Sequence, residues 1–213
     1  LDMQSTLSSI TQTSASRQTS ATGQTSSTRN GDTTANDPAA RAYDTFAGLY
    51  PAMPTPFTED GDIDHDRLAA AARRLEAAGV DGLVPVGSTG ESATLTHDEH
   101  VAVVETVVDA VDCPVIAGSG SNSTQEAISL SRRPVEAGAD ALLFISPYSN
   151  KPEPRGVRDH YTAVADALDV PCTAYNVPSL TGSNLDPEPV ATLPEHPTLQ
   201  GYKAASGSAR RMS

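Results

Sequence analysis

Six short apolar runs, separated by longer segments with helical periodicity, recur about every 30 residues and constrain the fold more than any other feature. They are Gly48–Met53, Gly82–Val86, Pro114–Ala117, Ala141–Ile145, Cys172–Tyr175 and Leu199–Tyr202. Near-continuous apolarity, as in Ala141–Ile145, indicates strands buried on both faces of a parallel sheet that helices cover. Repeated units of this length fit either a (β/α)8 barrel or a doubly wound sheet, and periodicity alone does not distinguish the two.

Helix signals fill the intervals between these runs. Asp64 is placed to cap a helix, and Thr96 with Glu99 three residues later has the pattern of a capping box. Pro134 falls inside the helix expected over residues 125–137. Because proline lacks an N–H and its ring clashes with the preceding turn, we expect it to interrupt this helix, at a cost of about 3 kcal/mol unless the helix ends there.

The first 42 residues differ in composition from the rest of the chain. They are rich in Ser and Thr and show no hydrophobic periodicity, so we expect residues 1–42 to form a disordered tail. Residues 43–213 would then be the folded part. A complete (β/α)8 barrel takes about 250 residues, so six strands predict an incomplete barrel. Its open sheet edges should leave the isolated chain inactive and prone to aggregate.

Charge and composition exclude several classes of function. With 27 acidic and 14 basic residues, the net charge of −13 opposes binding to nucleic acid. An acidic surface whose only lysines are Lys151 and Lys203 suggests a high-salt cytoplasm. No stretch approaches the roughly 18 consecutive apolar residues of a membrane span. Cys113 and Cys172 belong to no zinc motif, and we expect both to be buried thiols.

Two glycine-rich segments follow expected strands, at the edge where α/β enzymes bind ligands. In Gly87–Ser92, N–H groups and hydroxyls suit a small carboxylate or phosphate, although a purely structural turn explains the same residues equally well. Gly118–Ser123 begins like a dinucleotide fingerprint, but Ser123 replaces the third glycine, which disfavours nucleotide binding. His97 and His100 have no third metal ligand in view, and we expect them on an exposed first helical turn.

Lys203 directly follows the apolar part of the last strand. In a barrel, a lysine at this place would point into the mouth, where desolvation favours the neutral amine that acts as a nucleophile. The alternative is an ordinary surface lysine. Because the chain has so few lysines, a lysine at a strand end favours the nucleophile over the surface residue.

Four motifs occur in the order and at the spacing of the dihydrodipicolinate synthase and N-acetylneuraminate lyase superfamily, which the chain resembles from Thr45 to Gly207. They are Gly87–Ser92, Ser146–Pro152, Tyr175–Pro178 and Gly201–Gly207. The resemblance implies a (β/α)8 barrel and a class I aldolase-type lyase. Residues 91–100 and 114–120 most resemble the synthase branch, which condenses pyruvate with aspartate 4-semialdehyde in lysine and diaminopimelate biosynthesis.

The resemblance also implies a role for each candidate site residue. Lys203 would attack the C2 carbonyl of pyruvate and hold it as a Schiff base, and Tyr175 would relay protons together with Thr89. Ser88, Thr89 and Gly90 would hold the pyruvate carboxylate. No metal or organic cofactor is implied, because the Schiff-base lysine is the electron sink. A complete barrel of this superfamily is expected to be a homo-oligomer.

Two positions depart from the synthase pattern. Ser149 stands where the synthases have a second aromatic hydroxyl, and Leu180 stands where they have an arginine for the semialdehyde carboxylate. Leucine cannot bind a carboxylate, and lyase-like members of the superfamily have an apolar residue there. Two alternatives therefore stay open: an aldolase for 2-keto-3-deoxy sugar acids or N-acetylneuraminate, and a non-catalytic truncated remnant.

Overall fold

The computed structural model describes residues 46–184 and 196–207. Every described residue belongs to one compact unit, within the range Thr33–Ser213. The tail expected over residues 1–42 lies outside the described residues. Within the described ranges, no helix has both the length and the apolar character that crossing a membrane requires.

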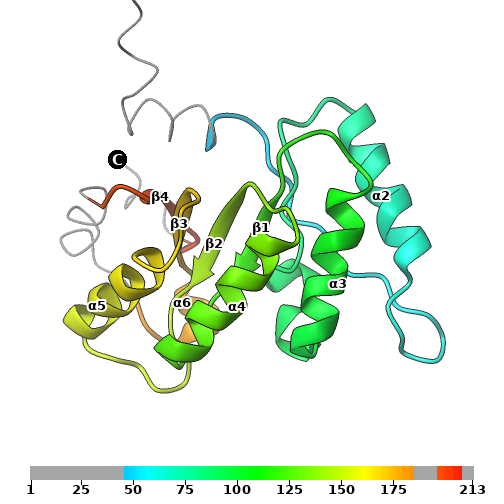
Figure 1. Cartoon of the computed structure of the whole chain (residues 1–213). Helices are drawn as coiled ribbons and strands as arrows, with labels where there is room; N and C mark the ends of the chain where they lie inside the picture. The colour runs from blue at the N-terminus through cyan, green and yellow to red at the C-terminus, as the bar shows by residue number, and fades with distance from the viewer. Residues whose placement is uncertain (1–45, 185–195, 208–213) are drawn as a thin grey trace, which may run out of the picture. The chain divides into compact units, whose positions relative to one another are not determined.

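The central sheet has four parallel strands in chain order (Figure 1). They are β1 (Ile116–Ser119), β2 (Ala141–Ile145), β3 (Cys172–Asn176) and β4 (Leu199–Ala204). The strands expected from the last four apolar runs are thereby confirmed, with ends that differ by at most two residues.

The first two expected strands are present only as isolated parallel bridges. Ala52 bridges to Val84, and Leu83 bridges to Val115, so two further segments continue the order of the sheet beyond β1. Longer strands do not form, because prolines without an N–H interrupt the ladder in and beside these segments. The prolines concerned are Pro51, Pro54, Pro85 and Pro114.

The helices follow one another in the same order as the strands (Figure 1). The structure describes α2 (His65–Ala77), α3 (His97–Val108), α4 (Thr124–Glu136), α5 (Pro154–Ala165) and α6 (Pro178–Thr181), with the short 3-10 helices η2 (Ser88–Gly90) and η3 (Ser92–Thr94). α2 packs on α3, α3 on α4, and α4 on α5 and β1.

Both expected N-caps are confirmed. The carboxylate of Asp64 accepts a hydrogen bond from the N–H of Arg67 at 2.9 Å, which begins α2. At the start of α3, the Thr96 N–H donates to Glu99 Oε2 at 2.7 Å, and the Glu99 N–H donates to Thr96 Oγ1 at 3.3 Å. This is the capping box that the sequence predicts.

The expectation that Pro134 interrupts its helix is wrong. α4 runs through Pro134 to Glu136. Like any proline inside a helix it removes one helical hydrogen bond, but its apolar ring is buried. Its carbonyl accepts the N–H of Ala139 at 3.0 Å, so the chain leaves the helix with this group paired.

The two faces of the sheet belong to different hydrophobic clusters. Leu142 and Phe144 of β2 share one cluster with residues of the helices, such as Val103. The alternate residues of the strand belong to the second cluster, whose members contain no residue of α2 to α6. This second cluster consists of Val84, Ile116, Ala141, Leu143, Tyr175 and Val177, with four partly buried neighbours.

This arrangement decides between the two architectures that the periodicity leaves open. A doubly wound sheet carries helices on both faces and reverses its strand order, whereas a barrel keeps chain order and carries helices on the outside only. The described residues have the second arrangement. The fold is therefore of the α/β class and is part of a (β/α)8 barrel.

Candidate active site

The carboxyl ends of the parallel strands meet at one edge of the sheet, which is where α/β barrels carry their active sites. The segments that reach this edge are η2 after the second bridged segment, the loop after β1, the loop 146–153 after β2, and α6 after β3. All the candidate site residues lie in these segments or in β3 and β4.

Lys203 and Tyr175 lie against each other in the structure. They are register partners in the β3–β4 ladder, and Lys203 Nζ is 4.4 Å from the centre of the Tyr175 ring. Desolvation by partial burial lowers the pKa of Lys203 from its ordinary value of 10.5. A lysine with a lowered pKa is neutral more often and is a better nucleophile.

A buried tyrosine that no sequence motif marks holds β3 in place at Tyr175. The hydroxyl of Tyr161, on α5, donates to the carbonyl of Tyr175 at 3.2 Å and lies 3.4 Å from the carbonyl of Phe144. Burial raises the pKa of Tyr161, so it stays a donor. Its signal in the sequence was weak, because a tyrosine on an apolar helix face resembles any other core residue.

The glycine-rich loop forms the 3-10 turn η2. Thr55 Oγ1 donates to the Gly90 carbonyl at 2.7 Å, and the Gly90 N–H donates to the Gly87 carbonyl at 3.0 Å. The turn therefore uses the Gly90 N–H for itself. The side chains of Ser88 and Thr89 are exposed and face solvent, so their hydroxyls are accessible to a ligand.

Only some of the predicted site residues are joined by contacts. Within the described ranges, no hydrogen bond links Thr89 to Tyr175 or to Lys203. The Lys203 amine also meets the face of the Tyr175 ring rather than its hydroxyl. The roles of Tyr175 and Thr89 as a proton relay, and of Ser88 and Gly90 in carboxylate binding, stay predictions.

A cavity of about 420 Å³ opens beside this group of residues. Ser88 and Leu180 are part of its wall, whereas Thr89, Tyr175 and Lys203 are not. A carboxylate connects the polar side chains of the wall.

Glu126 of α4 is the centre of the polar wall. It accepts a short hydrogen bond from Ser121 Oγ, and its other oxygen lies 3.3 Å from His97 Nε2. The glycine-rich segment after β1 thus contributes to this wall through Ser121.

The two departures from the synthase pattern lie at the same edge. Leu180, on α6, is 61% exposed, so its side chain fills no core position. Ser149 lies in the loop after β2 in the left-handed region, with φ +70°. Neither residue supplies the group that the resemblance expects at its position.

The histidine expectation is right for His97 and wrong for His100. His97 is exposed, but only 6% of His100 is exposed, and both side chains are part of the cavity wall. Desolvation lowers the pKa of His100 to about 4. Among the described residues, no group of three or more His, Cys, Asp or Glu side chains is arranged to hold a metal ion.

The expectation of two buried thiols is confirmed for Cys172 and only partly for Cys113. Cys172 is buried and Cys113 is half-buried, and both are free thiols. Burial raises the pKa of Cys172 to about 12 and also raises that of Cys113. High thiol pKa values disfavour the reactive thiolate.

Comparison with known proteins gives consistent results. The profile of the dihydrodipicolinate synthetase family matches residues 45–213. The curated 4-hydroxy-tetrahydrodipicolinate synthase of Haloarcula marismortui is 64% identical over 79% of this chain and 55% of its own length. That of Natronomonas pharaonis is 62% identical over 80% of this chain and 58% of its own length.

A crystal structure of a dihydrodipicolinate synthase has the same fold. It superposes with a TM-score of 0.74 at 46% identity, and the match covers 77% of this chain and 58% of that one. The chain therefore spans a little over half the length of the curated relatives that it matches.

Proposed function

The chain belongs to the dihydrodipicolinate synthetase family, and from this premise we propose that the protein condenses pyruvate with aspartate 4-semialdehyde. The relatives that carry the name 4-hydroxy-tetrahydrodipicolinate synthase support this reaction. The structural observation that carries the proposal is the amine of Lys203 against the ring of Tyr175, at the carboxyl edge of the barrel sheet.

In this mechanism Lys203 is the nucleophile. Its neutral amine adds to the C2 carbonyl of pyruvate, and loss of water leaves an imine. Loss of a proton from the methyl carbon gives an enamine, and the enamine carbon then forms the new bond to the aldehyde carbon of the second substrate. The protonated imine accepts the electron pair of the broken C–H bond, so the reaction requires no metal or organic cofactor.

The remaining site residues bind substrate and move protons. The hydroxyls of Ser88 and Thr89 are placed on the exposed side of η2, where they suit the pyruvate carboxylate. Gly90 shapes this turn, since its N–H is used within it. Tyr175 and Thr89 pass the protons that the imine steps release and consume.

A trapping experiment tests this proposal. Treatment with pyruvate and borohydride should reduce the imine and leave a stable adduct on Lys203, found by peptide mass mapping. Lys203→Met should abolish the adduct. Lys151 is the internal control, because it is the other lysine of the sequence and lies in an exposed loop. An adduct on Lys151, or none on the folded protein, would remove the Schiff-base assignment.

A second candidate function rests on Leu180. An exposed apolar side chain at the active edge suits a less charged second substrate, such as the aldehyde released from a 2-keto-3-deoxy sugar acid. Substrate profiling separates the two reactions: turnover of aspartate 4-semialdehyde favours the synthase, and cleavage of sugar acids favours the aldolase. A folded protein that forms no imine would instead be the non-catalytic remnant.

The setting of the reaction is part of the proposal. The two free cysteines and the biosynthetic role of the family support a cytoplasmic location. The net charge of −13 and the two haloarchaeal relatives support a cytoplasm with a high salt concentration. We expect the complete protein to be a homo-oligomer, which size measurement in high salt would test.

A further inference from the structure

The proposed second substrate carries a carboxylate as well as the aldehyde that reacts. A carboxylate that leaves water needs a charged or multiply donating partner, because an unpaired charge is costly to bury. Leu180, the exposed residue of α6 at the active edge, has no donor to offer. Another group at this edge must therefore bind the carboxylate.

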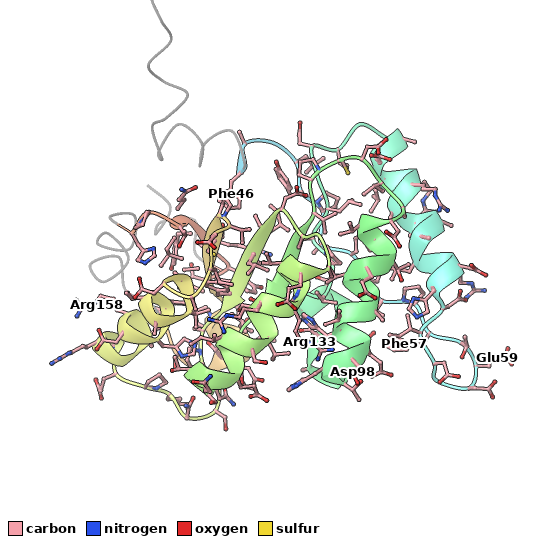
Figure 2. The ribbon with its side chains drawn as sticks, in the orientation of Figure 1. Phe46, Phe57, Glu59, Asp98, Arg133 and Arg158 are labelled. Carbon is pink, nitrogen blue, oxygen red and sulfur yellow. The ribbon has the colours of Figure 1, made fainter. Side chains whose placement is uncertain are left out.

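The described side chains with a permanent positive charge are few, and most lie on the outer helices. Within residues 46–184 and 196–207, the arginines lie on α2, α4 and α5, and four of them form ion pairs with aspartates. Figure 2 shows Arg133 beside Asp98 and Arg158 extending away from the sheet. The lysines are Lys151 and Lys203, and the imine occupies Lys203.

Lys151 reaches the helix that carries Leu180. Its Cε lies 2.9 Å, and its Nζ 3.5 Å, from the point where a Cβ on residue 182 would be. Residue 182 is a glycine with φ +70° and ends α6, so the lysine occupies space that a side chain would fill. The ammonium group thus lies within two residues of Leu180. Within the described part of the chain, Lys151 is in no ion pair.

The loop around Lys151 is held in an unusual backbone conformation. Ser149 and Lys151 both have positive φ, +70° and +41°, which costs free energy for residues with a Cβ. Asn122 stabilises the loop: its Oδ1 accepts the Tyr148 N–H at 2.8 Å, and its carbonyl accepts Asn150 Nδ2 at 3.4 Å. Both hydrogen bonds come from the loop after β1, so the loop that carries Lys151 is tied to the neighbouring loop at the sheet edge.

We propose that Lys151 binds the carboxylate of the second substrate, from the loop after β2, at the place where Leu180 leaves α6 without a donor. The inference rests on the proposed function for the identity of that substrate. It makes Lys151 the residue that selects aldehydes bearing a carboxylate, and it explains why an exposed lysine is retained in an almost lysine-free chain.

The test compares Lys151→Met with wild type, using 4-oxobutanoate as the charged probe and butanal as the neutral one. Methionine keeps the apolar length and removes the charge. Binding of 4-oxobutanoate, followed by calorimetry, should weaken about 10-fold to 100-fold, with butanal unaffected. In turnover assays the loss should appear in KM for aspartate 4-semialdehyde, with kcat largely kept, because the carboxylate is gripped equally in ground and transition states.

Two further variants make the result specific. Arg155→Met is the matched control: it removes one positive charge from an exposed side chain four residues away, already paired with Asp159, and should change neither probe. Leu180→Arg in the Lys151→Met background should restore binding of 4-oxobutanoate, since the guanidinium would come from the neighbouring position on α6.

These measurements test whether Lys151 binds the carboxylate. Unchanged 4-oxobutanoate binding in Lys151→Met, or an equal loss in Arg155→Met, overturns the assignment. Trapping of pyruvate on Lys203 is measured on the same variants: if it fails in wild type, the proposed function falls. The comparison of charged with neutral probe still decides whether Lys151 binds a carboxylate.

Discussion

His100 shows how the burial of one residue changes its chemistry. Its ring lies under the sheet edge with Nδ1 buried and unpaired, and desolvation outweighs the hydrogen bond to the Gly118 backbone in setting its pKa. His97 and Arg133 lower the pKa further. The folded protein therefore keeps His100 neutral down to about pH 4, whereas the unfolded chain protonates it near 6.5.

Stability should fall as the pH drops from about 6.5 to about 4. In that window the unfolded state binds a proton that the folded state does not, so the loss grows to about 3 kcal/mol at the lower end. Urea unfolding at a series of pH values measures it. His100→Gln should flatten this part of the profile, and the exposed His65→Gln should not. Equal slopes in both variants would contradict this account.

At the scale of elements, the glycine-rich loop depends on how closely two main chains approach. Gly118 of β1 packs directly under the backbone of Val86, and its N–H donates to the Pro85 carbonyl at 3.0 Å. Val86 itself has φ +49°, so the chain turns sharply just before η2. The absence of a Cβ at Gly118 is what allows the loop to sit at this edge.

Gly118→Ala should destabilise the protein by about 3 kcal/mol, because the new Cβ would overlap the carbonyl oxygen of Val86 and neither main chain can move freely. Gly87→Ala is the control within the same loop. No atom lies within 4 Å of its Cβ position, and its φ of −82° suits any residue, so the change should stay within about 0.5 kcal/mol. Thermal melts compare the two, and similar losses would argue against the close approach.

At the scale of the whole molecule, the dominant electrostatic feature is excess negative charge. Like charges on one surface repel each other in the compact state, and salt screens that repulsion. Part of the charge is concentrated in the exposed turn between Phe57 and Ile63, where Figure 2 shows Glu59 at the outer edge. Asp60 and Asp62 lie in the same turn.

Raising KCl from about 0.1 M to about 2 M should therefore raise the melting temperature by roughly 5 °C or more. The triple variant Glu59→Gln, Asp60→Asn, Asp62→Asn should show a smaller rise, because part of the repulsion is already gone. Circular dichroism melts across the salt series measure both. A melting temperature that stays level or falls with salt would refute the screening argument.

The linear pattern of residues was enough to place the elements, because their signals are local. Strands buried on both faces, such as β2 and β3, are visible in the sequence as apolar runs. A cap such as Thr96 with Glu99 is visible because its residues lie within one turn of each other. Proline is also a local signal, yet α4 continues through Pro134, since the burial of its ring depends on tertiary packing that the local pattern does not contain.

Long-range packing decided the rest. Whether the sheet is a barrel depends on which face the helices cover, and a strand pattern that is apolar on both faces does not contain that information. Contacts between distant segments have no local signature either. The register of β3 and β4 places Lys203 beside Tyr175, and the packing of α3 buries His100. The loop after β2 places Lys151 at the end of α6. Each of these positions depends on contacts between residues far apart in the chain.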